Sequence, residues 1–208
     1  MSPVLYLHGF ASSPQSKKAQ YIRQRFASTG LEMELPELVP GPFGEQTITG
    51  QLQLIEEIAA GRKVSIIGSS LGGYLAALYA ARHPEVHKLV LLAPAFGFAE
   101  IWANALGPAQ VAAWEASGKM MQMNYATEVE EELSWRLMED ARGYEAEPAV
   151  TQPTLIVHGR QDLVVPVEGS RAFAATRPNV ELQEVDDTHE LSADLPGLFD
   201  SLSEFLRR

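Results

Sequence analysis

The stretch of residues 63–74, KVSIIGSSLGGY, decides the fold. Its first five residues form a short β-branched run that predicts a strand, and the Leu- and Ala-rich residues 71–82 predict a helix that ends before Pro84. Between them, Gly68-Ser69-Ser70-Leu71-Gly72 fits the pattern G-x-S-x-G. A sharp turn from strand to helix leaves no room for a Cβ atom two positions before and after its central residue. We therefore expect the turn to present the Ser70 hydroxyl at the helix N-terminus, where the dipole favours negative charge.

Two other interpretations of this turn stay open at this point. Glycines that serve packing alone would give the same letters. A phosphate-binding loop is disfavoured, because neither Gly-Lys-Ser/Thr nor G-x-G-x-x-G is present.

Strand and helix patterns alternate on both sides of this stretch. This alternation predicts right-handed crossovers and a mainly parallel sheet, and the continuous apolar runs suit strands that are covered on both faces. We therefore expect an α/β fold with about six mainly parallel strands flanked by helices. The predicted strands are 4–7, 31–35, 63–67, 88–93, 154–158 and 180–185, and the predicted helices are 14–28, 46–60, 71–82, 168–175 and 195–206.

Composition narrows the class of protein. A chain of 208 residues with 46 % hydrophobic and 21 % charged residues fits one globular domain. The absence of cysteine excludes disulfides, thiolate metal sites and a cysteine nucleophile. A net charge of −11 makes a nucleic-acid partner unexpected. No membrane span and no signal peptide is predicted, so we expect a cytoplasmic protein.

A serine hydroxyl becomes a nucleophile only with a base in hydrogen-bond reach and an acid that orients the base. Asp162 follows the predicted strand 154–158, and His189 follows the predicted strand 180–185. Both lie past the C-terminal ends of strands, the edge where open α/β sheets bind ligands. The order Ser70, Asp162, His189 is the one used by enzymes with this turn. The sequence thus predicts nucleophile, acid and base.

Other titratable residues compete for these roles. Among the histidines, His83 and His87 are expected at the opposite edge of the sheet and His158 as a packed or hydrogen-bonded core residue. Among the acids, Asp187 is the best substitute for Asp162. Asp186 and Glu190 are expected to be solvated, because near neighbours of His189 are poorly placed to reach its far nitrogen.

An oxyanion needs preorganised N–H donors. We expect one from the backbone of Leu71 and the other from Phe10, with Ala11 as the alternative, in the loop after the first strand. Gly9 would allow that loop to approach the serine, and His8 would order it through hydrogen bonds.

Together these motifs resemble the α/β-hydrolase superfamily from end to end. They are His8-Gly9-Phe10, Gly68–Gly73, His158-Gly159-Arg160-Gln161-Asp162 and Thr188-His189. The opening YLHGFASSPQSKKA, residues 6–19, and residues 68–74 are more specifically similar to the small YqiA-type bacterial esterases over roughly the first 95 residues. The resemblance implies a minimal core, hydrolysis of esters or thioesters through Ser70, Asp162 and His189, and no cofactor. No metal is expected either, because no histidine pair has ligand spacing on a helix and the carboxylates are scattered.

Residues 96–147 break the alternation and match no family pattern. No strand is evident there, so we expect a helical cap, by analogy a lid, between core segments 1–95 and 148–208 of one domain. Glu128 and Glu130–Glu132 are expected on a solvated helix face. An adaptable apolar wall over the serine is expected from Trp102, Trp114, Met120, Met121 and Met123, although packing of extra helices would need the same residues.

The sequence therefore predicts a serine esterase that acts on small or medium acyl groups, as a monomer or homodimer. The alternatives are an acyl-CoA thioesterase or a C–C bond hydrolase with the same triad, and a non-catalytic small-molecule-binding protein that kept the fold.

Overall fold

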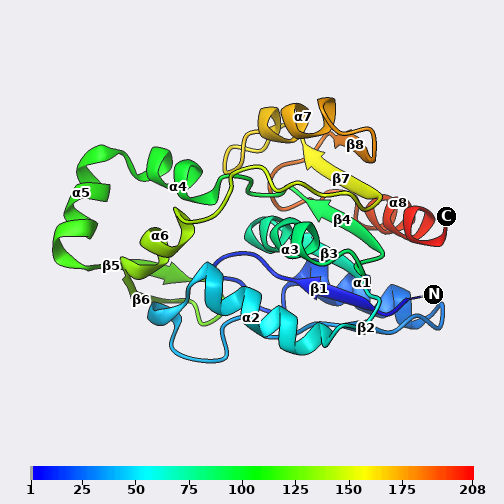
Figure 1. Ribbon diagram of the computed structural model, residues 1–208, viewed down its shortest axis with the longest axis horizontal. Coiled ribbons are helices and arrows are strands. Elements are labelled where there is room, and N and C mark those ends of the chain that lie inside the picture. Colours follow the sequence, from blue (N-terminus) through cyan, green and yellow to red (C-terminus); the bar gives the residue numbers. More distant parts are fainter. Residues whose placement is uncertain (1) are drawn as a thin grey trace.

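Six parallel strands form the central sheet, in the order β2-β1-β3-β4-β7-β8 (Figure 1). The structure is a computed structural model that describes residues 2–208. The strands are β1 (Val4–Leu7), β2 (Met33–Glu34), β3 (Ser65–Ser69), β4 (Lys88–Leu92), β7 (Thr154–Gly159) and β8 (Val180–Val185). The predicted parallel α/β sheet is thereby confirmed, with the second strand shorter than expected.

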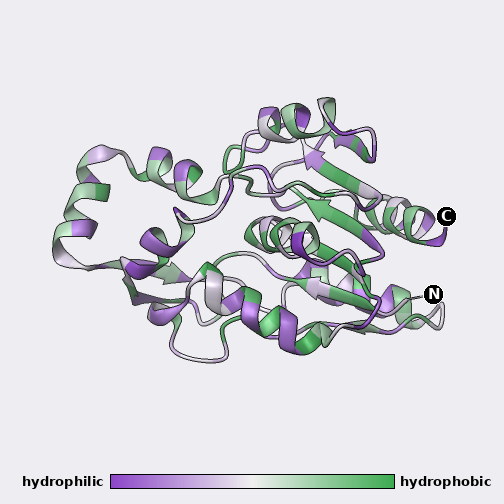
Figure 2. Ribbon diagram, in the orientation of Figure 1, coloured by the Kyte–Doolittle hydropathy of each residue, from purple (hydrophilic) through white to green (hydrophobic). Residues whose placement is uncertain are grey.

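Helices cover both faces of this sheet (Figure 1). On one face lie α1 (Lys17–Ala27) and α8 (Leu195–Arg207), and on the other lie α2 (Ile48–Ala59), α3 (Leu71–Arg82) and α7 (Val167–Ala175). In β1, Leu5 and Leu7 pack towards α2 and α3, whereas Val4 and Tyr6 pack towards α1 and α8. Burial on both faces explains why β1, β3 and β4 are mostly apolar, and Figure 2 shows β4 largely in green. The edge strand β8 is only partly buried and carries Glu181, Gln183 and Glu184.

The cap follows β4 and lies at one end of the sheet (Figure 1). It contains α4 (Phe98–Leu106), α5 (Pro108–Ser117), the antiparallel strands β5 (Lys119–Asn124) and β6 (Val129–Ser134), and α6 (Arg136–Ala141). The expectation of a cap without strands was therefore wrong. Glu130–Glu132 lie on a strand rather than a helix, and Glu128 lies in the turn with a φ of 61°.

The hairpin turn explains this error. It carries no Asn-Gly or Asp-Gly signal, and the side chain of Asn124 closes it instead: Oδ1 accepts from the Ala126 N–H at 3.0 Å. The polar character of the hairpin, seen in Figure 2, also hid its alternation.

Polar contacts anchor the cap to the core. The carboxylate of Asp140 in α6 accepts hydrogen bonds from the backbone N–H and the hydroxyl of Thr49, at 2.7 and 2.6 Å, in the first turn of α2. The short 3-10 helix η1 (Phe43–Glu45) lies so close to β6 that a Cβ on Gly44 would overlap the carbonyl oxygen of Glu132. No helix in residues 2–208 is both long and apolar enough to cross a bilayer.

Candidate active site

Ser70 lies in a strained turn between β3 and α3. Its φ of 55° and ψ of −119° are rare for a residue with a side chain. A Cβ on Gly68 would overlap the carbonyl oxygen of Gly72, and a Cβ on Gly72 would overlap that of Leu7. The two flanking glycines are therefore required by backbone contact, as the sequence pattern predicted.

The loop after β1 lies directly against this serine. A Cβ built on Gly9 would be 3.3 Å from the Cβ of Ser70 and 3.8 Å from its hydroxyl oxygen. His8 is buried, and its Nδ1 donates to the Gly9 carbonyl at 3.0 Å. Its Nε2 lies 3.1 Å from the Leu38 backbone nitrogen and 3.1 Å from Oε1 of Glu37. The prediction that His8 orders this loop through hydrogen bonds is confirmed.

Both candidate oxyanion donors lie near this contact. Phe10 follows Gly9 in the loop, and Ala11 beyond it has a φ of 54°. Leu71 is the first residue of α3, where backbone N–H groups have no partner within the helix. The donor roles of Phe10 and Leu71 remain predictions.

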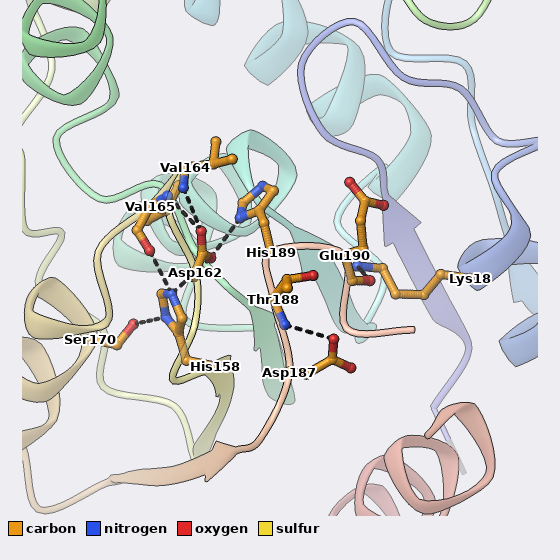
Figure 3. A network of polar contacts seen from close by, with 10 residues as sticks. All are labelled: Lys18, His158, Asp162, Val164, Val165, Ser170, Asp187, Thr188, His189 and Glu190. Carbon is orange, nitrogen blue, oxygen red and sulfur yellow. Dashed lines mark hydrogen bonds and ion pairs between the residues drawn. The ribbon is translucent and has the colours of Figure 1, made fainter. Parts of the chain in front are cut away.

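Asp162 and His189 meet at the same edge of the sheet (Figure 3). Nδ1 of His189 donates to Oδ2 of Asp162 at 2.7 Å. The other carboxylate oxygen, Oδ1, accepts from the backbone N–H groups of Val164 and Val165, each at 2.8 Å. The structure thus joins the predicted acid and base, which lie 27 residues apart in the chain.

The surroundings of Asp162 keep its carboxylate ionised. Burial acts to raise its pKa, but hydrogen bonds from His158, His189 and the Val165 N–H together hold the pKa well below its ordinary value. His158 is completely buried, with Nε2 3.1 Å from Oδ2 of Asp162. The expectation of a hydrogen-bonded core histidine is confirmed, but the sequence did not predict its partner.

Backbone contacts hold the loop that carries Asp162 against the loop that carries His189. A Cβ on Gly159 would lie 2.5 Å from the carbonyl oxygen of Thr188, and the Gln161 N–H donates to the Asp187 carbonyl at 3.0 Å. The Asp187 side chain accepts from the N–H groups of Thr188 and Ala193, at 2.7 and 2.9 Å. Asp187 therefore stabilises the loop that carries His189, whereas Asp162 accepts the hydrogen bond from the His189 ring.

Sequence reasoning missed Lys18. Its ammonium group donates to the carbonyl oxygen of Glu190 at 2.9 Å, which ties the first turn of α1 to the loop of His189 (Figure 3). Burial lowers the pKa of Lys18 to about 8, against the attraction of Glu190, Asp187 and Asp162. The only signal in the sequence is the position of this lysine shortly after the loop with Phe10.

The remaining histidines lie away from this edge. His83 stacks on Tyr79 and pairs with Glu56 and Glu85, at 3.1 Å each. The backbone N–H of His87 donates to the Val64 carbonyl, just before β3 begins. Both therefore lie at the opposite edge of the sheet, as predicted.

Aromatic side chains connect the loop of Phe10 to the cap. The centroid of the Phe10 ring lies 4.8 Å from that of Trp102 in α4, and the ring centroids of Trp102 and Trp114 in α5 are 5.0 Å apart. Trp114 is buried and donates its indole N–H to the Leu133 carbonyl at 3.1 Å. Met120 and Met123 are partly buried and Met121 is 52 % exposed. Only Trp102 among these predicted pocket residues contacts the loop that borders Ser70 in this way.

The structure brings the acid and base together and puts the serine at the same edge, because β3, β4, β7 and β8 are parallel neighbours. Among residues 2–208 it contains no hydrogen bond between Ser70 and His189. The approach of those two side chains remains a prediction.

Comparison with known proteins supports this description. Residues 3–206 match the model of the Uncharacterised protein family UPF0227. Est1E from Butyrivibrio proteoclasticus superposes with a TM-score of 0.81 at 22 % identity, over 99 % of this chain and 87 % of that one. Alpha/beta hydrolase domain-containing protein 10 from mouse gives 0.80 at 20 %, over 99 % and 89 %. Paleococcus ferrophilus monoacylglycerol lipase gives 0.75 at 20 %, over 99 % and 95 %.

These similarities confirm the predicted α/β-hydrolase fold. The family match covers nearly the whole chain, and the solved structures superpose over almost all of its length. The chain belongs to the UPF0227 family of YqiA-like proteins and has the α/β-hydrolase fold.

Proposed function

We propose that this protein is a serine hydrolase that cleaves carboxylic esters of small or medium acyl groups. The observation that carries the proposal is the 2.7 Å hydrogen bond between Asp162 and His189 at the sheet edge that also holds the strained Ser70. A packing turn or a binding protein has no need of all three groups in this arrangement.

In the proposed reaction, the Ser70 oxygen attacks the acyl carbon while Nε2 of His189 takes the hydroxyl proton. Asp162 holds the ring in the tautomer that leaves Nε2 free and stabilises the imidazolium. The N–H groups of Phe10 and Leu71 stabilise the oxyanion. His189 then protonates the leaving alkoxide, which departs as the alcohol. In the second half of the reaction His189 takes a proton from water, the water oxygen attacks the acyl carbon, and the proton passes to the Ser70 oxygen as the carboxylic acid leaves.

The proposed acyl site lies between the strained turn of Ser70 and the cap. Trp102 is the candidate to contact substrate, because it is partly exposed and packs on Phe10. The buried Trp114 would support this wall from behind. Leu163 and Val164, which follow the acid, are 97 % and 59 % exposed and offer further apolar surface beside the site.

A panel of esters tests the proposal. It contains p-nitrophenyl esters from acetate to decanoate, monoacylglycerols and methyl ferulate, because one structural neighbour is described with ferulic acid bound. Purified protein is expected to hydrolyse short and medium esters, and Ser70→Ala is expected to lose at least about a thousandfold in kcat.

Two results point elsewhere. Turnover of acyl-CoA or a C–C substrate in preference to every oxygen ester would favour the related triad chemistries. Absence of turnover on the whole panel, with binding of a small molecule that Ser70→Ala retains, would favour the binding protein.

A further inference from the structure

One carboxylate oxygen of Asp162 lies between two histidines (Figure 3). Oδ2 is 2.7 Å from Nδ1 of His189 and 3.1 Å from Nε2 of His158. The side chain of His189 is 17 % exposed, whereas those of His158 and Asp162 are 0 % exposed. His158 therefore reaches the acid from the protein interior and has no contact with substrate.

Hydrogen-bond partners fix the tautomer of His158. Its Nε2 is 2.9 Å from the carbonyl oxygen of Val165, which can only accept, so Nε2 carries a proton. Its Nδ1 is 2.8 Å from the hydroxyl oxygen of Ser170, a buried residue of α7. With the ring proton on Nε2, the Ser170 hydroxyl donates to Nδ1. A chain of donors thus leads from Ser170 through His158, whose single Nε2 proton is shared between the Val165 carbonyl at 2.9 Å and Oδ2 of Asp162 at 3.1 Å.

The two oxygens of the acid are held differently. Oδ1 is fixed by two backbone N–H groups of its own loop, those of Val164 and Val165. Oδ2 has only side-chain donors, and one of them, His189, must move protons between serine and leaving group. His158 is the donor that does not take part in the chemistry.

We propose that His158 is a positioning residue that holds Oδ2 of Asp162 in line with His189, with Ser170 fixing its tautomer. The inference rests on the proposed function, because it assigns His158 a role through the proposed acid. It explains why a histidine is completely buried at the end of β7, four residues before the acid.

Three variants and a control separate positioning from general stability. His158→Leu removes the donor, His158→Gln retains an N–H near the position of Nε2, and Ser170→Ala removes only the outer hydrogen bond. The control is Gln152→Leu, just before β7. Gln152 is also buried, and its Nε2 donates to the carbonyls of Ala80 and His83 at 2.9 and 3.1 Å, with no contact to the acid.

At matched concentrations of folded protein, we expect His158→Leu to lower kcat about 10- to 100-fold with KM changed by less than about threefold, as for a misplaced catalytic group. His158→Gln should recover part of that loss, Ser170→Ala should lose less than His158→Leu, and Gln152→Leu should keep kcat. Equal losses in His158→Leu and Gln152→Leu, or no rescue by His158→Gln, would overturn the proposal.

Proton NMR tests the same inference without any substrate. The Nδ1 proton of His189 should resonate far downfield in the wild type and in Gln152→Leu, and should shift and exchange faster in His158→Leu and Ser170→Ala. An unchanged signal in those two variants would overturn the positioning role even if esters are hydrolysed. A changed signal without ester turnover would support it while the proposed function fails. If His158→Leu does not fold, His158→Gln and Ser170→Ala decide both measurements.

Discussion

Substitution of Gly9 by alanine tests the contact between the oxyanion loop and the serine. The new Cβ would lie 3.3 Å from the Cβ of Ser70 and 3.4 Å from the carbonyl oxygen of Ser69. Carbon atoms prefer separations of about 3.5 to 4.0 Å, so the loop must retreat by a few tenths of an ångström. The backbone of Gly9 does not need a left-handed conformation, so the variant is expected to fold.

The retreat carries the Phe10 N–H away from the oxyanion position. Complete removal of one oxyanion donor costs roughly 100- to 1,000-fold in kcat, or about 2.7–4 kcal/mol. A partial displacement is therefore expected to cost about 10- to 50-fold in kcat, about 1.4–2.3 kcal/mol of transition-state stabilisation. The loss of folding stability should stay near ~1 kcal/mol, the low end for slight overpacking.

The assay is kcat for the best p-nitrophenyl ester together with urea denaturation. Gly41→Ala is the matched control, because Gly41 is exposed and a Cβ there would have no atom within 4 Å. A Gly9→Ala enzyme with unchanged kcat, or an equal loss in Gly41→Ala, would refute the reasoning.

Three further predictions concern the loops of the acid and base. Gly159→Ala should destabilise the protein by ~1–3 kcal/mol in urea denaturation, because its Cβ would meet rigid backbone at Asp187; stability within ~0.5 kcal/mol of wild type would contradict this. Because the pKa of Asp162 is lowered by folding, acid protonates this carboxylate in the unfolded chain before it does so in the folded protein. The contribution of Asp162 to stability is therefore fully present above about pH 4 and is lost as the pH falls. In Asp162→Asn, the free energy of unfolding should fall by roughly 2 kcal/mol less than in the wild type over the same acid range. The same dependence of the unfolding free energy on pH in the two proteins would contradict the prediction. The pKa of Lys18 near 8, below its ordinary 10.5, means that stability rises between pH 8 and pH 10.5 through this group. Lys18→Met should remove about 1–3 kcal/mol of that rise, measured as a difference from wild type so that other titrations cancel, and an unchanged rise would exclude the effect.

The parts of the molecule that could be predicted are those where one backbone contact demands one residue type. Gly68 and Gly72 must lack side chains for the turn at Ser70 to form, so their spacing predicts the turn. The ends of parallel strands meet at one edge, so the positions of Asp162 and His189 after two strands predict their contact.

The parts that could not be predicted depend on contacts between distant segments. A buried histidine packs in the same way whether or not it donates to the acid, so the sequence predicts the burial of His158 but not its hydrogen bond to Asp162. Lys18 finds Glu190 across 172 positions, with no local pattern to indicate the pair. The hairpin of the cap forms through tertiary contacts with η1 and the side chain of Asn124 rather than through a strong turn signal.

The most direct test of the central claim is the site and rate of labelling by a fluorophosphonate, followed by peptide mass mapping. We predict one adduct on Ser70, formed at least about a thousandfold faster in the wild type than in His189→Ala, because the serine is reactive only beside its base. Lack of any adduct, an adduct on another residue, or equal labelling rates in the wild type and His189→Ala would contradict the account.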